Sequence, residues 1–192
     1  MVRVFIGAVA AAVAMLVIGF IFFATPLARI AMGSIDDGQA AAVQQTLAAS
    51  LPRTGTYAVP GMDTAAQTNM YSQGPIATIH YTTGGFAAPP GAAAIVGGLV
   101  LNFVVALLIG AALIGIDRRV PDFGSRARAA VIVAVAAAAF CHLGEPVWMH
   151  HDWPHFIYVF VADSAMLAAA GLIVAWSLPR SRAAPEEAPT DV

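Results

Sequence analysis

The most concentrated group of side chains that could do chemistry lies between residues 142 and 155. Imidazole and carboxylate groups are the ligand types that suit Zn²⁺, Cu²⁺ or Fe in proteins. Because residues three apart on a helix share a face, the first two members of the group would project together. The segment is therefore a candidate metal site, and its predicted ligands are His142, Glu145, His150, His151 and His155.

Two other interpretations of this segment stay open. Pro146 and Pro154 interrupt a regular ligand spacing, and no H-E-x-x-H motif or equivalent occurs. Histidines beside tryptophans are common where a chain meets a membrane surface, so a hydrated loop explains the composition without any metal. Since an unperturbed histidine titrates near pH 6.5, the segment could also respond to pH. We take the hydrated loop as the simpler interpretation and predict no cofactor, with a zinc, copper or iron ion as the alternative.

A second polar group is expected inside the apolar part of the chain. Asp163 is the one carboxylate between Phe156 and Leu178, and Asn102 would lie at a similar depth in another apolar run. Ser164, and His142 as well, would be near enough to extend the network. Such groups are costly in hydrocarbon and face neighbouring helices, so they predict either a proton or ion relay or an interhelical hydrogen-bond clamp. We favour the clamp, because a relay needs polar steps in the inner half of the membrane too.

The sequence offers no recognisable catalytic set. Walker, nucleotide-binding and serine-hydrolase elbow motifs are missing, and a single cysteine, Cys141, excludes an intrachain disulfide or a C-x-x-C site. All nine basic residues are arginine, in clusters too small for a nucleic-acid footprint, and the formal net charge is −2. We predict no catalytic residues and no nucleic-acid partner, and an enzyme is the less favoured class.

The elements that position these groups are long apolar runs. Of the 192 residues, 59% are hydrophobic and 10% charged, and the mean hydropathy is +0.78, which excludes a single soluble globular domain. A helix needs about 20 apolar residues to cross a bilayer. The fold class predicted is all-α transmembrane, a four-helix membrane bundle with a small α+β cap outside the cytoplasm. The spans expected are residues 1–24, 92–116, 129–149 and 156–178.

The arginines set the orientation that we expect. Seven of them fall at residue 3, at 118–128 and at 180–182, whereas Arg29 and Arg53 lie on the opposite side. Positive residues stay on the cytoplasmic side. We therefore place both termini in the cytoplasm of a bacterium, the chain in its inner membrane and residues 25–90 outside. The first span is expected to be a retained anchor rather than a cleaved signal, because its apolar run is too long. Residues 91–180 hold the other three spans, and residues 181–192 are predicted to be a disordered cytoplasmic tail.

Residues 25–90 are expected to form a small folded cap. Ser34 is the predicted N-cap of a helix that continues to Ser50. Short β-prone runs at 56–59 and 76–81, each bounded by proline and glycine, could pair as a small sheet. In that sheet His80 would be an exposed strand residue rather than a ligand.

The cap also carries a resemblance. Its segments Gly55-Thr56-Tyr57-Ala58-Val59-Pro60-Gly61 and Gly74-Pro75, with Ala162-Asp163 in the last span, resemble a family of small uncharacterised bacterial membrane proteins. That family has a G-x-Y-x-x-P-G segment, then a G-P segment leading into a strand. The resemblance covers roughly residues 1–178, implies a four-span inner-membrane protein and brings no established activity. The run His150-His151-Asp152 departs from the pattern, in which aromatic residues dominate this loop, so a metal site is not implied as a family property.

Pairs of small residues four apart predict close packing of helix backbones. There are more of them than one bundle core requires, so some are expected to meet another protein. The leading hypothesis is a non-catalytic accessory or structural subunit of a larger membrane complex, possible hosts being energy-transducing ones. The alternative is a metal- or proton-handling membrane protein that uses residues 142–155 and Asp163, and a channel or transporter is a weaker third. The pairs are Gly7/Ala11, Ala10/Ala14, Ala94/Gly98, Ala111/Gly115 and Ala134/Ala138.

Overall fold

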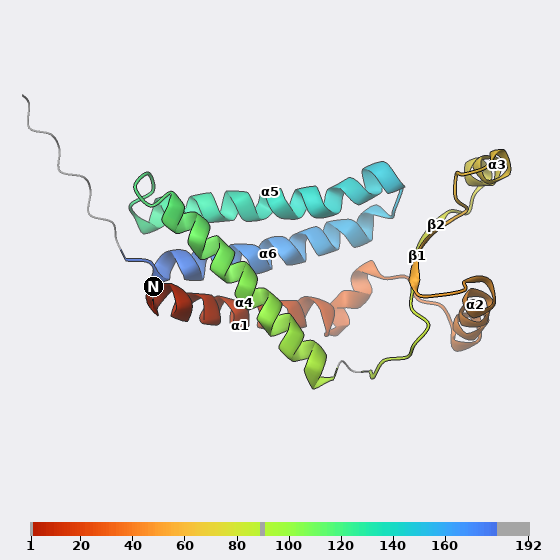
Figure 1. Ribbon diagram of the computed structural model, residues 1–192, viewed down its shortest axis with the longest axis horizontal. Helices are drawn as coiled ribbons and strands as arrows, with labels where there is room; N and C mark the ends of the chain where they lie inside the picture. The colour runs from red at the N-terminus through yellow and green to blue at the C-terminus, as the bar shows by residue number, and fades with distance from the viewer. Residues whose placement is uncertain (1, 89–90, 180–192) are drawn as a thin grey trace, which may run out of the picture. The chain divides into compact units, whose positions relative to one another are not determined.

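The computed structural model describes residues 2–88 and 91–179, and the tail predicted at 181–192 lies outside these described residues. Four helices in it are long and apolar enough to cross a membrane, as the hydropathy predicts (Figure 1). At about 1.5 Å per residue, the shortest of them is about 33 Å long, which matches the hydrocarbon thickness of a bilayer. They are α1 (Val2–Phe23), α4 (Ala92–Gly115), α5 (Phe123–Met149) and α6 (Trp153–Ser177).

Two of these helices begin earlier than the sequence suggested. The α5 helix begins at Phe123 rather than 129, because the Asp122 side chain accepts a hydrogen bond from Ser125 N and caps it there. The α6 helix begins at Trp153 rather than 156, because Asp152 caps it and Pro154 lies in the first turn, where no backbone donor is needed. The helices therefore extend beyond the predicted spans at their first ends, by six residues for α5 and by three for α6.

The chain divides into two compact units, residues 1–32 with 92–192 and residues 33–91. In the first unit α6 packs against α5 and α1, and α1 packs against α4, which crosses it obliquely in Figure 1. The core of this unit is built mainly from alanines with Met15, Leu113 and Val174. Small residues bring the backbones close: a Cβ on Gly171 of α6 would stand 2.7 Å from the Ala130 Cβ of α5. A short 3-10 helix, η1 (Pro26–Ala31), follows α1.

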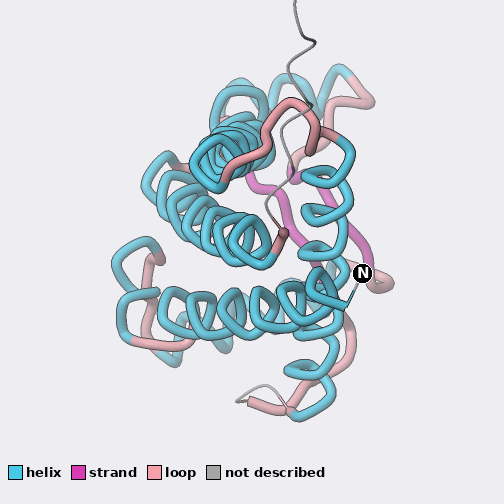
Figure 2. The backbone as a smooth tube through the Cα atoms, turned by 90° about the vertical axis from the view of Figure 1, so that its left-hand side faces the viewer, coloured by secondary structure: helices cyan, strands magenta, loops and turns pink. Residues whose placement is uncertain are grey.

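The second unit, residues 33–91, contains α2 (Asp37–Ser50), β1 (Gly55–Val59), α3 (Ala65–Gln73) and β2 (Ala77–Tyr81). The strands, magenta in Figure 2, pair antiparallel with Thr56 opposite His80, so the small sheet is confirmed. His80 is exposed, as expected, and its Nδ1 lies 3.1 Å from Thr56 Oγ1. None of the described residues 33–88 is buried, so this unit lacks a core of its own.

Two features of the second unit differ from expectation. The α2 helix is capped by Asp36 rather than Ser34, because Asp36 and Gln39 bond each other's backbone amides in a capping box. The helix α3 was not predicted at all. Thr64 caps it and Gly74 ends it at a φ of 66°, a conformation that favours glycine.

Candidate functional site

The turn between α5 and α6 brings most of the predicted site residues into one region. His150 is the C-cap of α5 and has the left-handed conformation, with a φ of 56°. Two residues later, Asp152 is the N-cap of α6. Histidine is among the residues that tolerate this region of φ better than most. The short connection folds α6 back along α5, so side chains one to three turns from it face each other.

The closest polar contact in this region joins His142 of α5 to Asp163 of α6. His142 Nε2 lies 2.6 Å from Asp163 Oδ2, and the two side chains are 20% and 34% exposed. The imidazole and the carboxylate are therefore within hydrogen-bond distance, and the pair joins two apolar helices by a polar contact.

The contact seen for Asp163 is to His142, one of the neighbours named for it from the sequence. No hydrogen bond joins Asn102 to Asp163 among the described residues, because α4 packs mainly on α1 while Asp163 faces α5. Ser164 lies beside the pair in sequence, but its Oγ is buried without a hydrogen-bond partner in the described part of the chain. Among the contacts expected for this polar cluster, the structure therefore shows the hydrogen bond between Asp163 and His142.

A second pair lies nearer the turn. Glu145 Oε2 is 3.3 Å from His151 Nδ1, and the His151 ring stacks on Phe156 with centroids 5.3 Å apart. One turn of α5 separates Glu145 from His142, so the two histidine–carboxylate pairs follow one another along the α5–α6 interface.

The remaining histidines of the segment point elsewhere. His155 Nδ1 lies 3.2 Å from the Ala31 carbonyl oxygen of η1, and His150 is exposed at the helix end. The five predicted ligands are thus divided among two pairs, a backbone contact and an exposed side chain. Within residues 2–88 and 91–179, no three His, Cys, Asp or Glu side chains are grouped so that they could hold a metal ion. Metal binding by this segment stays a prediction. The structure brings its side chains together at most two at a time, as histidine–carboxylate pairs.

Another hydrogen bond fastens the same end of the bundle. The Tyr158 hydroxyl donates to the Phe22 carbonyl oxygen at 2.6 Å, and its ring packs edge-on against Phe22 and Phe23. It satisfies one of the carbonyls that the end of α1 would otherwise leave open. Through Tyr158 the helix α6 is tied to α1 as well as to α5.

The opposite end of α5 contains a residue that sequence reasoning counted only as a loop charge. Arg126 is 1% exposed, and its guanidinium contacts the Asp117 carboxylate after α4. It also donates to the Val120 carbonyl at 3.0 Å and to the Pro179 carbonyl at 2.8 Å. One arginine therefore joins the α4–α5 connection to the end of α6. The signal that could have revealed it is the cap Asp122-x-x-Ser125, which places Arg126 inside a helix.

The cap residue Asp122 is itself perturbed. The hydrogen bond from the Ser125 hydroxyl, and then the one from Ser125 N, lower the pKa of the Asp122 carboxyl below its ordinary value of 3.8. Hydrogen bonds to a carboxylate favour its charged form.

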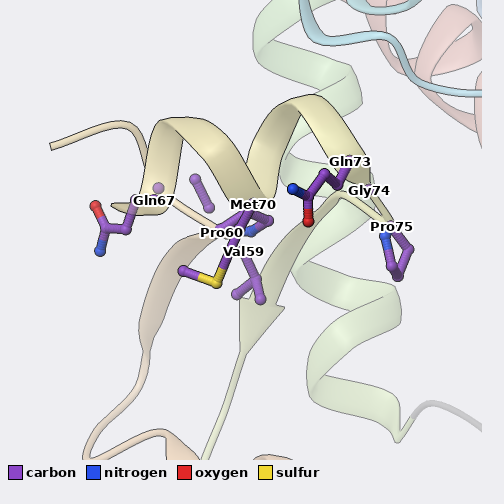
Figure 3. A pocket seen from close by; sticks show the side chains of 9 residues that line it. Val59, Pro60, Gln67, Met70, Gln73, Gly74 and Pro75 are labelled. Atoms are coloured by element: carbon purple, nitrogen blue, oxygen red, sulfur yellow. The ribbon is translucent and has the colours of Figure 1, made fainter. Parts of the chain in front are cut away.

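A separate groove of about 480 Å³ lies within the second unit, between the end of β1 and α3. Val59, Met70 and the prolines Pro60 and Pro75 make most of its wall, and Gln67 and Gln73 stand at its sides (Figure 3). The Gln67 amide oxygen accepts a hydrogen bond from Asp63 N, so this side chain serves the local fold. The groove has no titratable side chain in its lining and brings no reactive group to a ligand.

No protein-family model, curated protein or solved structure matches this chain.

Proposed function

We propose that the chain is an integral membrane protein that serves as a non-catalytic accessory or structural subunit of a larger membrane complex. In this proposal the four long helices cross a bacterial inner membrane with both termini in the cytoplasm, and residues 25–90 lie outside. The single observation that carries the docking role is the free surface of α4. Of its 24 residues, only Ala106, Gly110 and Leu113 are buried.

The small residues of α4 support this assignment. Gly7/Ala11 on α1 and Ala134/Ala138 on α5 are buried in the chain's own packing, whereas Ala111 and Gly115 of α4 are exposed. A Cβ built on Gly98 or Gly115 would meet nothing within 4 Å. Small residues let a second helix approach closely, and in lipid that approach is a main source of helix association. The α4 face is suited to a helix of another subunit.

The test is purification from native membranes in a mild detergent, followed by native gels and mass spectrometry. The wild-type chain should migrate with a defined set of other membrane proteins. The double variant Gly98→Leu with Gly115→Leu should lose them while keeping its helix content. The control, Ala136→Leu with Ala137→Leu on the exposed side of α5, should keep them. A wild-type chain that purifies alone would overturn the proposal.

The His142–Asp163 pair favours a second candidate, a proton- or metal-handling protein. An ionisable pair between two membrane helices is expensive and is often kept for a function. In proteoliposomes carrying a pH-sensitive dye, the wild-type chain should alter proton movement and Asp163→Asn should abolish the effect, while Asn102→Ala should not. Elemental analysis before and after replacing His150 and His151 by alanine tests the metal form of this candidate. Absence of both proton movement and stoichiometric metal would leave the pair as a structural clamp.

A further inference from the structure

The α5 helix carries a notch on its exposed side, close to the turn into α6. Six residues spaced at helical intervals line it: Phe140, Cys141, Gly144, Glu145, Trp148 and Met149. Its volume is about 300 Å³. The notch exists because Gly144 has no side chain between two large aromatic residues four positions away on either side. A Cβ on Gly144 would stand 3.7 Å from Trp148 Cδ1, so the indole overhangs the empty position.

The chemistry of the notch changes along its length. At one end Phe140 is 88% exposed and, with Cys141, makes an apolar wall. The other end is lined by Glu145, whose side chain is 43% exposed, and by Trp148, which is 77% exposed. An exposed carboxylate next to an aromatic face is the combination that recognises an organic ammonium group, through charge and through cation–π attraction. The apolar wall suits a hydrocarbon chain.

The charged residues around the notch also favour a cationic ligand. Residues 129–179 contain two carboxylates besides Glu145, namely Asp152 and Asp163, and no lysine or arginine. Asp152 caps α6 and Asp163 is bonded to His142, and as carboxylates neither supplies a positive charge to Glu145. The group that does contact Glu145 is the His151 imidazole, at Oε2. An anionic headgroup would be repelled here, and an ammonium would be attracted.

We propose that this notch binds one phospholipid with a primary ammonium headgroup, such as phosphatidylethanolamine. The ammonium contacts the Glu145 carboxylate and the face of Trp148, and the upper part of an acyl chain lies along Gly144 and Phe140. The site rests on the insertion of α5 in a bilayer, which is part of the proposed function, but not on the accessory role or on any protein partner.

The test uses the full chain reconstituted in nanodiscs of phosphatidylethanolamine and phosphatidylglycerol in equal amounts, extracted gently and weighed by native mass spectrometry. The wild-type chain should retain phosphatidylethanolamine over phosphatidylglycerol by about tenfold, as expected from one exposed ion pair plus one cation–π contact. Glu145→Gln, which removes the charge but hardly changes the shape, should lower the preference to about threefold, the part that the cation–π contact supplies. Trp148→Leu should lower the preference about threefold.

Two controls and one further disrupting variant separate the site from other causes. His151→Asn removes the contact of Glu145 with the imidazole but keeps the carboxylate, so the lipid preference should persist. Trp176→Leu changes an equally exposed tryptophan at the other end of α6 and should also leave it unchanged. Gly144→Leu fills the notch and should release the lipid. Equal retention of the two lipids by the wild type, or an unchanged preference in Glu145→Gln, would overturn the proposal. A chain that fails to enter nanodiscs would instead refute the membrane assignment.

Discussion

Replacement of Arg126 by methionine is the sharpest test of how this bundle is held together. Methionine has a similar length but has no charge and no donor, so the change leaves the Asp117 carboxylate without the guanidinium. It also removes the donors from the Val120 and Pro179 carbonyls. Because one side chain joins three segments, the first turn of α5 and the end of α6 should separate more easily without it.

The size of the effect follows from the burial of the two partners. Breaking a buried ion pair by removing one member costs about 3–5 kcal/mol. Arg126 is 1% exposed but Asp117 is 36% exposed, so water can solvate the carboxylate that is left. We therefore expect a loss at the lower end, about 3 kcal/mol of unfolding free energy. Arg126→Lys keeps the charge but loses the fork of donors, and should lose about 1–2 kcal/mol.

The assay is unfolding in mixed micelles of increasing SDS fraction, followed by far-ultraviolet circular dichroism. The matched control is Arg128→Met, since Arg128 lies on the same turn and is exposed; it should change stability by less than about 0.5 kcal/mol. A double-mutant cycle with Asp117→Asn should show a coupling of about 1–2 kcal/mol. If Arg126→Met matches its control, the buried arginine does not hold the bundle and the reasoning is wrong.

Three further predictions test other contacts. Gly171→Leu should destabilise the bundle by about 1–3 kcal/mol because its side chain would enter Ala130 of α5, while Gly115→Leu on a free face should not; both are measured by the same SDS titration. Because hydrogen bonds lower the pKa of Asp122 below 3.8, its charged form stabilises the fold above that pH and the contribution is lost as the pH falls. The stability gap between wild type and Asp122→Ala should therefore narrow below pH 3.8, and an unchanged gap would contradict the cap. Tyr158→Phe should cost about 1 kcal/mol, seen as earlier unfolding, and no change would mean that water replaces the hydroxyl.

The long helices could be predicted from the sequence because the requirement is simple. A run of about 20 mostly apolar residues has few alternatives, and all four runs are helices in the structure. Their ends were harder to predict. Arg126 was assigned to a loop by its charge, yet it lies inside α5, where Asp117 and backbone carbonyls satisfy its guanidinium. A charged residue in a sequence is normally assigned to a solvent-exposed position. Only the structure shows the hydrogen-bond partners that allow this arginine to be buried.

The polar pair illustrates a different limit. The position of Asp163 along its apolar run was enough to name several possible partners, among them Asn102 and His142. Depth alone does not say which helices are neighbours, and that order is set by the packing of small residues such as Gly171 against α5. The helix α3 was missed for a local reason: its residues have no apolar periodicity, and its only strong signal is the Thr64 cap.

The polar contacts of the first unit also separate α4 from the other long helices. His142 and Asp163 join α5 to α6, and Tyr158 joins α6 to the end of α1. Among the described residues, no side-chain hydrogen bond comes from α4 itself, and the nearest such tie is made by Asp117, just beyond its final turn. A polar contact therefore holds α4 only near its C-terminal end, and elsewhere it makes apolar contacts with α1 and α6. The N-terminal half of α4 can shift to pack against another helix at low energetic cost. The first turns of α4, up to Gly98, are therefore where a helix of another subunit should make its closest approach.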